Sequence, residues 1–222
     1  MSRTLAVLRP EPGNAATAAR AGAAGYAVLR LPLFAVVPLD WPVPDASDHD
    51  ALVLTSANTV RAAGASLGRL AGLPVIAVGE QTAAAAREAG LSVAATGGSD
   101  ATGLATLLAE RGMSRALHLG GRERTPVAGV TRAIPVYASE PRAVAPVDLA
   151  RLAGSVALLH SARAAARLGA LLDWAEVPRS HVTIGAFSAA IADAAGSGWR
   201  AVAVAGSPSD AALFAAINAL GR

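Results

Sequence analysis

Short apolar runs that stop at a glycine or a polar residue alternate with longer alanine-rich stretches along most of the chain. One apolar run, residues 75–78, stops at Gly79 and leads into an alanine-rich stretch that ends at Gly90. This order predicts a strand, a tight turn and a helix. Nearly the same order recurs between Val182 and Gly196, and related residues precede and follow both copies. A duplication of this length predicts twin domains.

The same pattern can be followed through the whole chain. It predicts strands over residues 4–9, 26–37, 50–55, 74–78, 91–95, 115–119, 134–137, 156–159, 182–184 and 201–204. It predicts helices over residues 14–24, 56–70, 82–89, 101–111, 125–131, 162–172, 188–195 and 210–220, and a turn over 120–124. Strands that alternate with helices of this length predict an α/β fold with parallel sheets covered on both faces.

Two proline-rich segments, near residues 38–45 and 139–146, do not suit central strands and predict crossings between domains. The first strands lack partners of their own, and the last third needs two more strands to match the middle of the chain. We therefore expect one discontinuous domain of residues 1–37 plus 143–222, with a twin domain at 42–138 inserted into it. Residues 38–41 and 139–142 would be the linkers.

Composition narrows the function classes. The chain is 53% hydrophobic, which excludes disorder, and its longest apolar run, residues 26–39, is interrupted by Arg30 and two prolines. The N-terminus has no signal-peptide core, and there is no cysteine, so we expect a cytoplasmic protein without a disulfide framework. All 19 basic residues are arginine, the net charge is only +3 and 4% of residues are aromatic. With no basic run, neither nucleic acid nor a membrane is an expected partner.

Candidate binding residues follow the strands, because ligands of open parallel sheets bind beyond the carboxyl ends of the strands. Backbone N–H groups at helix starts and arginine side chains there attract anions. Helix capping alone would also explain Ser56, Thr82, Ser161 and Ser188. The candidates for substrate binding are Arg9, Thr55, Ser56, Asn58, Gly79, Gln81, Thr82, Ser161, Arg163, Gly185 and Ser188.

Familiar catalytic motifs are missing. No G-x-S-x-G elbow, phosphate-loop lysine or G-x-G-x-x-G fingerprint is present, and the four histidines have no paired metal spacing. Glu80 and Asp100 are explained by their places at helix starts. Tyr137 ends a strand where the chain crosses back, so we expect it near the cleft between the domains. The alternative is a half-buried ring that packs with Trp41.

Several segments together resemble the uroporphyrinogen-III synthase family over essentially the whole chain. They are Leu54-Thr-Ser-Ala-Asn-Thr-Val-Arg61, Ala77-Val-Gly-Glu-Gln-Thr-Ala-Ala84, Val136-Tyr137, His160-Ser-Ala-Arg163 and Ile184-Gly-Ala-Phe-Ser-Ala-Ala190. The resemblance implies two flavodoxin-like (HemD-like) α/β domains joined by a two-stranded linker. It implies that hydroxymethylbilane, a linear tetrapyrrole, is cyclised to uroporphyrinogen III with loss of water and inversion of ring D.

The resemblance also implies a monomer that needs no metal and no organic cofactor. Tyr137 matches the tyrosine favoured as the family's proton donor, and Ser161 and Ser188 match positions that contact substrate. His160, Arg163 and Phe187 depart from the family's usual polar residues. Three alternatives remain: a non-catalytic tetrapyrrole- or anion-binding module on this fold, an unrelated binding protein of the periplasmic type, and a nucleotide-dependent transferase.

Overall fold

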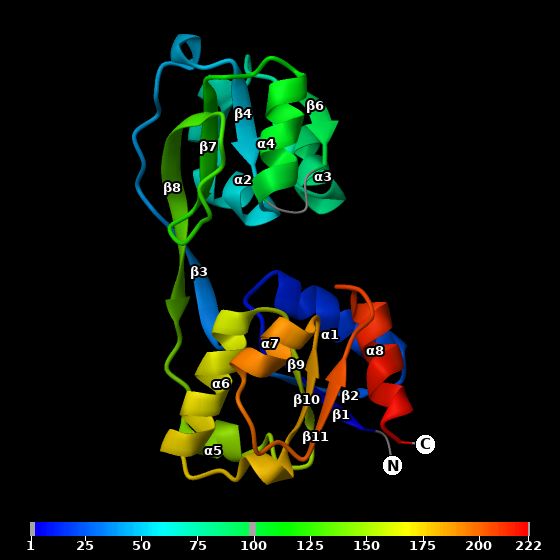
Figure 1. Cartoon of the computed structure of the whole chain (residues 1–222). Helices are drawn as coiled ribbons and strands as arrows, with labels where there is room; N and C mark the ends of the chain where they lie inside the picture. Colours follow the sequence, from blue (N-terminus) through cyan, green and yellow to red (C-terminus); the bar gives the residue numbers. More distant parts are fainter. Residues whose placement is uncertain (1–2, 98–100, 222) are drawn as a thin grey trace. The chain divides into compact units, whose positions relative to one another are not determined.

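The computed structural model describes residues 3–97 and 101–221. The chain divides into two compact units (Figure 1). Unit 1 contains residues 1–35 and 141–222, and unit 2 contains residues 36–140. Gly98, Ser99 and Asp100, which figured in the sequence analysis, lie outside the described residues.

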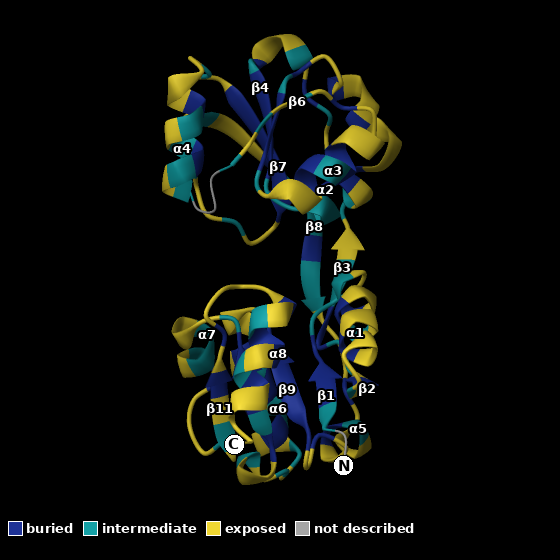
Figure 2. Ribbon diagram, turned by 90° about the vertical axis from the view of Figure 1, so that its right-hand side faces the viewer, coloured by how far each residue is buried: buried dark blue, intermediate teal, exposed yellow. Residues whose placement is uncertain are grey.

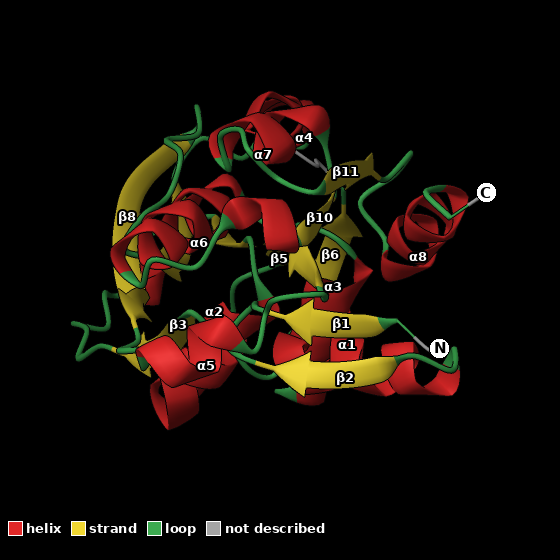
Figure 3. Cartoon of the chain, turned by 90° about the horizontal axis from the view of Figure 1, so that it is seen from below, coloured by secondary structure: helices red, strands yellow, loops and turns green. Residues whose placement is uncertain are grey.

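Unit 1 is built around one parallel sheet in the order β11-β10-β9-β1-β2. This is the 2-1-3-4-5 order of flavodoxin-like folds when strands are counted along the chain. Figure 3 shows β1 and β2 side by side. The strands are β1 (Thr4–Val7), β2 (Ala27–Arg30), β9 (Val156–Leu159), β10 (Thr183–Ala186) and β11 (Ala201–Val204). The helices are α1 (Gly13–Ala23), α5 (Pro146–Ala150), α6 (Ala162–Trp174), α7 (Ala189–Ala194) and α8 (Asp210–Ala219), with a 3-10 turn at Arg179–His181.

The central strands of unit 1, β1, β9 and β10, are buried on both faces because helices cover each side, and β1 and β9 are mostly dark blue in Figure 2. Alternate residues of β9 face opposite ways. Ala157 and Leu159 pack in one cluster with α5, α6 and α7, while Val156 and Leu158 pack in another with α1 and α8. These non-alternating apolar strands are what a helix-covered parallel sheet requires.

Unit 2 contains a sheet in the order β3-β8-β7-β4-β5-β6. The pairs from β8 to β6 are parallel. The strands are β3 (Phe34–Pro38), β4 (Ala51–Leu54), β5 (Val75–Ala77), β6 (Val93–Thr96), β7 (Ala116–Gly121) and β8 (Val130–Pro141). The helices are α2 (Ala57–Ala63), α3 (Glu80–Glu88) and α4 (Ala101–Glu110), with 3-10 segments at Ala46–Asp48 and Gly64–Leu70. Helices α2 and α3 cover one face and α4 the other.

The duplication seen in the sequence is also present in the sheets. The repeat copies form β5 with α3 in unit 2 and β10 with α7 in unit 1. Each copy lies between the strand that precedes it and the strand that follows it, giving β4-β5-β6 and β9-β10-β11. The remaining places are taken by β7, β8 and β3 in the six-stranded sheet, and by β1 and β2 in the five-stranded sheet. The α/β fold class with parallel sheets is confirmed.

Some predicted elements were wrong in extent. The strand predicted over 26–37 is two strands, and they belong to different sheets: β2 pairs with β1 and β3 pairs with β8. The helix predicted over 56–70 ends at Ala63, where Gly64 takes a φ of 61°, and continues as a 3-10 segment. No helix forms over 125–131, where Gly129 has a φ of 86°, and the next strand, β8, is 12 residues long. Residues 120 and 121, expected in a turn, end β7.

No helix among residues 3–97 and 101–221 is long and apolar enough to cross a membrane.

Candidate functional site

Parallel strands bring their carboxyl ends to one edge of a sheet, so each unit has one edge where the predicted binding residues gather. We call these the unit 1 edge and the unit 2 edge. The unit 1 edge holds Arg9, Ser161, Arg163 and Ser188, while Gly185 lies inside β10. The unit 2 edge holds Thr55, Ser56, Asn58, Gly79, Gln81, Thr82 and Tyr137.

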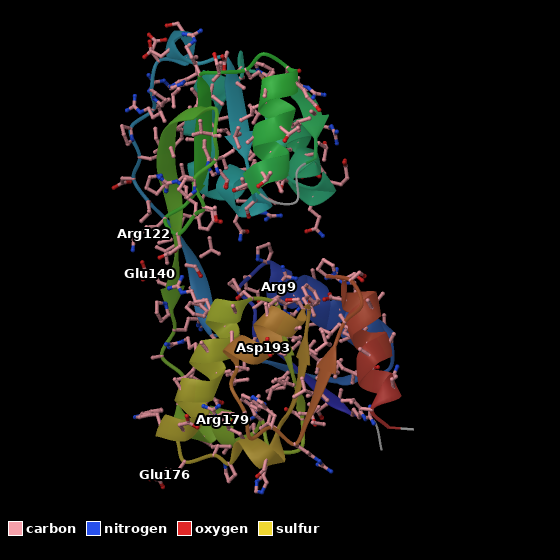
Figure 4. All side chains as sticks on the ribbon, viewed as in Figure 1. Arg9, Arg122, Glu140, Glu176, Arg179 and Asp193 are labelled. Carbon is pink, nitrogen blue, oxygen red and sulfur yellow. The ribbon has the colours of Figure 1, made fainter. Side chains whose placement is uncertain are left out.

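Arg9 follows β1 and is half-buried; Figure 4 labels it at the unit 1 edge. Its guanidinium lies against Gly13, where any Cβ would collide with it. The buried Asn14 side chain donates to the backbone oxygens of Val7 at 2.7 Å and Arg9 at 3.0 Å, which fixes this turn. Burial lowers the pKa of Arg9 and nearby Asp210 opposes that shift, but an arginine stays charged. Within the described residues, the Arg9 guanidinium makes no hydrogen bond.

Asp210, the first residue of α8, is the buried anion of the unit 1 edge, with 7% of its surface exposed. Its Oδ2 accepts hydrogen bonds from the Thr17 hydroxyl and from Arg20 Nε, each 2.8 Å long. Its Oδ1 accepts from His160 Nε2 at 3.2 Å. Burial raises the pKa of Asp210, but these hydrogen bonds and the Arg20 charge outweigh burial and hold it well below its ordinary value.

His160 follows β9 and is held between Asp210 and the ring of Phe187, whose centroid is 4.4 Å from that of the imidazole. Because Nε2 faces a carboxylate, Nε2 carries the proton of the neutral ring. Burial lowers the pKa of His160, and the Arg9 charge adds to this, while the hydrogen bond to Asp210 opposes it. His160 is therefore neutral near pH 7.

The other predicted residues of the unit 1 edge are exposed or structural. Ser161 and Ser188 are the N-caps of α6 and α7, and each hydroxyl oxygen accepts from a backbone N–H. The Arg163 guanidinium is exposed and lies over the Phe34 ring, 4.6 Å from its centroid. Gly185 was expected in the turn after the strand, but it lies inside β10, which extends to Ala186.

At the unit 2 edge, Thr55 follows β4, and its hydroxyl oxygen is 3.2 Å from His118 Nε2. His118 belongs to β7 and is 2% exposed. Burial, and then the positive charge of Arg124, lower the pKa of His118 to about 4. A neutral histidine therefore holds the Thr55 hydroxyl.

Ser56 caps α2 through a 3.2 Å hydrogen bond from Asn58 N–H, and the Asn58 side chain accepts from Arg61. Gly79, with a φ of 77°, caps α3, which begins at Glu80. The cap expected of Thr82 is therefore wrong, because Thr82 is the third residue of α3 and is buried. Gln81 is exposed at the start of the same helix.

Tyr137 lies in β8 and is half-buried. Its ring packs on the same core cluster as Trp41. Its backbone oxygen accepts a 2.8 Å hydrogen bond from Arg122 N–H. The side chain of Arg122 forms a 2.8 Å ion pair with Glu140, which lies in β8 like Tyr137 (Figure 4). The backbone hydrogen bond from Arg122, the residue that follows Gly121, therefore holds Tyr137 next to β7.

Two hydrogen-bond networks were not predicted from the sequence. The hydrogen bond between Thr17 and Asp210 joins residues 193 apart, and that between Thr55 and His118 joins residues 63 apart. The only sequence signal for either network was that Asp210 lies at the start of a predicted helix. Within the described part of the chain, no three histidine or acidic residues lie close enough to hold a metal ion.

Comparison with known proteins agrees with this architecture. The profile of the family described as uroporphyrinogen-III synthase HemD matches residues 15–215. The uroporphyrinogen-III synthetase structure from Helicobacter pylori 26695 is similar at a TM-score of 0.68 with 18% identity, covering 99% of this chain and 100% of that one.

A mutant uroporphyrinogen III synthase structure from the extremely thermophilic bacterium Thermus thermophilus is similar at a TM-score of 0.54 with 22% identity, covering 100% and 99%. No curated protein sequence matches the chain significantly. The structures show a shared fold, and the profile extends over nearly the whole chain. The chain belongs to the uroporphyrinogen-III synthase (HemD) family.

Proposed function

We propose that this chain is a lyase of tetrapyrrole (heme) biosynthesis that cyclises hydroxymethylbilane to uroporphyrinogen III, with loss of water and inversion of ring D. The observation that carries this proposal is the family match over residues 15–215, which includes Tyr137 and every proposed binding residue except Arg9. The α/β units and their polar edges are consistent with it.

For this reaction the protein has mainly to orient the substrate and to supply one proton. It does not need to supply a nucleophile, because the electron-rich pyrrole provides the attacking electrons. In our proposal, the Tyr137 hydroxyl donates a proton to the leaving hydroxyl group. The C–O bond breaks, water leaves and an azafulvene forms. Attack by the substituted carbon of ring D then gives a spiro intermediate, which fragments and recloses with the ring inverted.

The substrate carries eight carboxylates, and each edge offers groups that bind anions. Arg9 has a half-buried guanidinium with no hydrogen bond among the described residues, so a carboxylate can take both of its parallel N–H donors. Arg163 adds an exposed cation to the same edge. We propose that these arginines bind substrate carboxylates.

The capping serines can bind the substrate without giving up their caps. The hydroxyl oxygens of Ser56, Ser161 and Ser188 accept from backbone N–H groups. A hydroxyl has one donor as well as its acceptor sites, so each O–H remains available for a carboxylate. The other proposed contacts are Thr55, Asn58, Gly79, Gln81, Thr82 and Gly185.

We also propose that the protein acts as a cytoplasmic monomer and does not bind nucleic acid. The net charge of +3 and the absence of a basic run in the sequence support the second point. Light scattering at several protein concentrations tests the first, because a stable dimer would double the measured mass.

The function is tested by supplying fresh hydroxymethylbilane, oxidising the products and separating the uroporphyrin isomers. We expect mostly isomer III from the wild-type chain. Tyr137→Phe should lower kcat by about 10²-fold or more, because general acids contribute roughly 10²–10⁴-fold. Tyr26→Phe changes the only other tyrosine, which bonds Asn218, and is the matched control.

Isomer I alone, the product of spontaneous closure, would instead favour a non-catalytic tetrapyrrole-binding module. Isomer III at an unchanged rate from Tyr137→Phe would remove Tyr137 as the proton donor and leave the synthase assignment in place.

A further inference from the structure

Two consecutive glycines end β7, and neither needs to be glycine for its backbone conformation. Gly120 and Gly121 are the last residues of the strand, and neither has a positive φ. Their backbones would therefore accept a side chain. What favours glycine at both positions is the limited space above the Cα atoms.

That space is taken by two different side chains. A Cβ on Gly121 would lie 3.0 Å from Cζ of Tyr137 and 3.1 Å from its hydroxyl oxygen. The nearest neighbours of a Cβ on Gly120 would be Nε2 of His118 at 3.0 Å and Cδ of Arg124 at 3.6 Å, and not Tyr137. The Tyr137 phenol thus rests directly on the backbone of Gly121, and its hydroxyl is part of the contact.

The register of the strands produces this contact. Gly120 pairs with Pro135 and Gly121 pairs with Tyr137, so the ladder shifts between the two glycines and Val136 is the extra residue. Such bulges re-aim a side chain and are frequent beside active sites. Val136 is buried in the core, and this fixes the orientation of its neighbour Tyr137.

Hydrogen bonds hold both sides of the contact. Arg122 N–H donates to the Tyr137 backbone oxygen at 2.8 Å. Arg124 donates from Nη1 to the Gly121 oxygen and from Nη2 to the Ala133 oxygen, each at 3.0 Å. One guanidinium therefore connects Gly121 to β8, the strand that carries Tyr137.

We infer that Gly121 is a positioning residue that sets the place of the Tyr137 hydroxyl for proton transfer, with Arg124 holding Gly121 in place. The inference rests on the proposed role of Tyr137. Proton transfer needs the two heavy atoms about 2.6–3.2 Å apart. A misplacement of about 1 Å costs on the order of 10²-fold in rate, so a methyl group that displaces the phenol by less should cost about tenfold.

The test combines Gly121→Ala with Tyr137→Phe in a double-mutant cycle, using the isomer III assay. We expect Gly121→Ala to lower kcat about tenfold while KM stays within about twofold. In the Tyr137→Phe background the same change should have no further effect, because the hydroxyl that it displaces is gone. Gly120→Ala is the matched control, and any effect that it has should persist when Tyr137 is Phe.

Arg124→Gln provides a second variant in case Gly121→Ala does not fold. It removes the bond to the Gly121 oxygen without adding volume, and its loss of kcat should also shrink in the Tyr137→Phe background. Urea unfolding of every variant separates misfolding from mispositioning.

Normal kcat in Gly121→Ala, or an equal loss with and without the Tyr137 hydroxyl, would overturn the inference while the synthase function stood. Isomer I alone from the wild-type chain would overturn the proposed function, and the inference with it. The two failures are therefore distinguishable.

Discussion

Burial gives His118 a different chemistry from that of a histidine in solution. Burial and the Arg124 charge lower its pKa to about 4, whereas an unfolded histidine titrates near pH 6.5. Between these values the unfolded chain binds a proton at this site and the folded chain does not. The free energy of unfolding therefore falls as the pH falls from about 6.5 to about 4, by up to roughly 3 kcal/mol.

The variant His118→Gln tests this prediction. Glutamine can still bond the Thr55 hydroxyl but does not titrate, so the free energy of unfolding should depend less on pH in this range. Urea unfolding at several pH values measures both curves. Parallel curves for the variant and the wild type would mean that His118 titrates alike in the folded and unfolded states.

Arg9 gives a second prediction, for substrate binding. Arg9→Gln removes a cation that has no hydrogen bond among the described residues, so we expect KM to rise about tenfold, the low end for a hydrogen bond to a charged group. The value of kcat should change little because Arg9 is not the proposed proton donor. Arg200→Gln changes an exposed arginine directly before β11 and is the matched control. If both variants raise KM equally, the effect is one of total charge and not of the site.

The sequence was sufficient to predict the role of residues that depend only on their neighbours along the chain. Ser56, Ser161 and Ser188 were predictable as caps because a cap requires only residue type and the start of a helix. The partners of Asp210 and His118 were not predictable, since no local pattern relates a strand end to a residue 50 or more positions away.

At the scale of elements, the duplicated strand–helix pattern predicted which segments take equivalent places in the two sheets. β9 and β11 have the predicted bounds, because each is a short apolar run that begins after a polar residue, Ser155 or Arg200. β8 was predicted too short, since Thr131 and Arg132 interrupt its apolar pattern although both lie in the strand. The pairing with β7 outweighs the local sequence there.

Gly185 illustrates packing between elements and gives a third prediction. Its Cα faces α8, and a Cβ would lie 3.0 Å from Ile217 Cδ1 and 3.2 Å from Leu213 Cδ1. Gly185→Val should therefore push α8 away from β10 and lower the free energy of unfolding by about 1–3 kcal/mol. Gly206→Val is the control because a Cβ at Gly206 would meet nothing within 4 Å. Equal losses in the two variants would contradict this packing.

At the scale of the whole molecule, each unit has its own core. The four hydrophobic clusters of the described residues each lie within one unit, two in unit 1 and two in unit 2. The inserted domain was predicted because the first strands lacked partners of their own. Strands can be counted in this way from the sequence alone. The use of residues 38–41 and 139–142 as linkers stays a prediction, and β3 and β8 both extend into these segments.

Separate cores predict separate responses to core mutations. Leu168 is fully buried in a unit 1 cluster, and Leu168→Ala should cost about 2–5 kcal/mol through lost contacts and a cavity. Native-state hydrogen exchange should show this loss in the amides of β1, β9 and β10, while those of β4 and β7 keep their protection. Leu117→Ala, in a unit 2 cluster, should give the reverse result. If either variant lowers protection equally in both sheets, the two units unfold as one cooperative body, although their cores are separate.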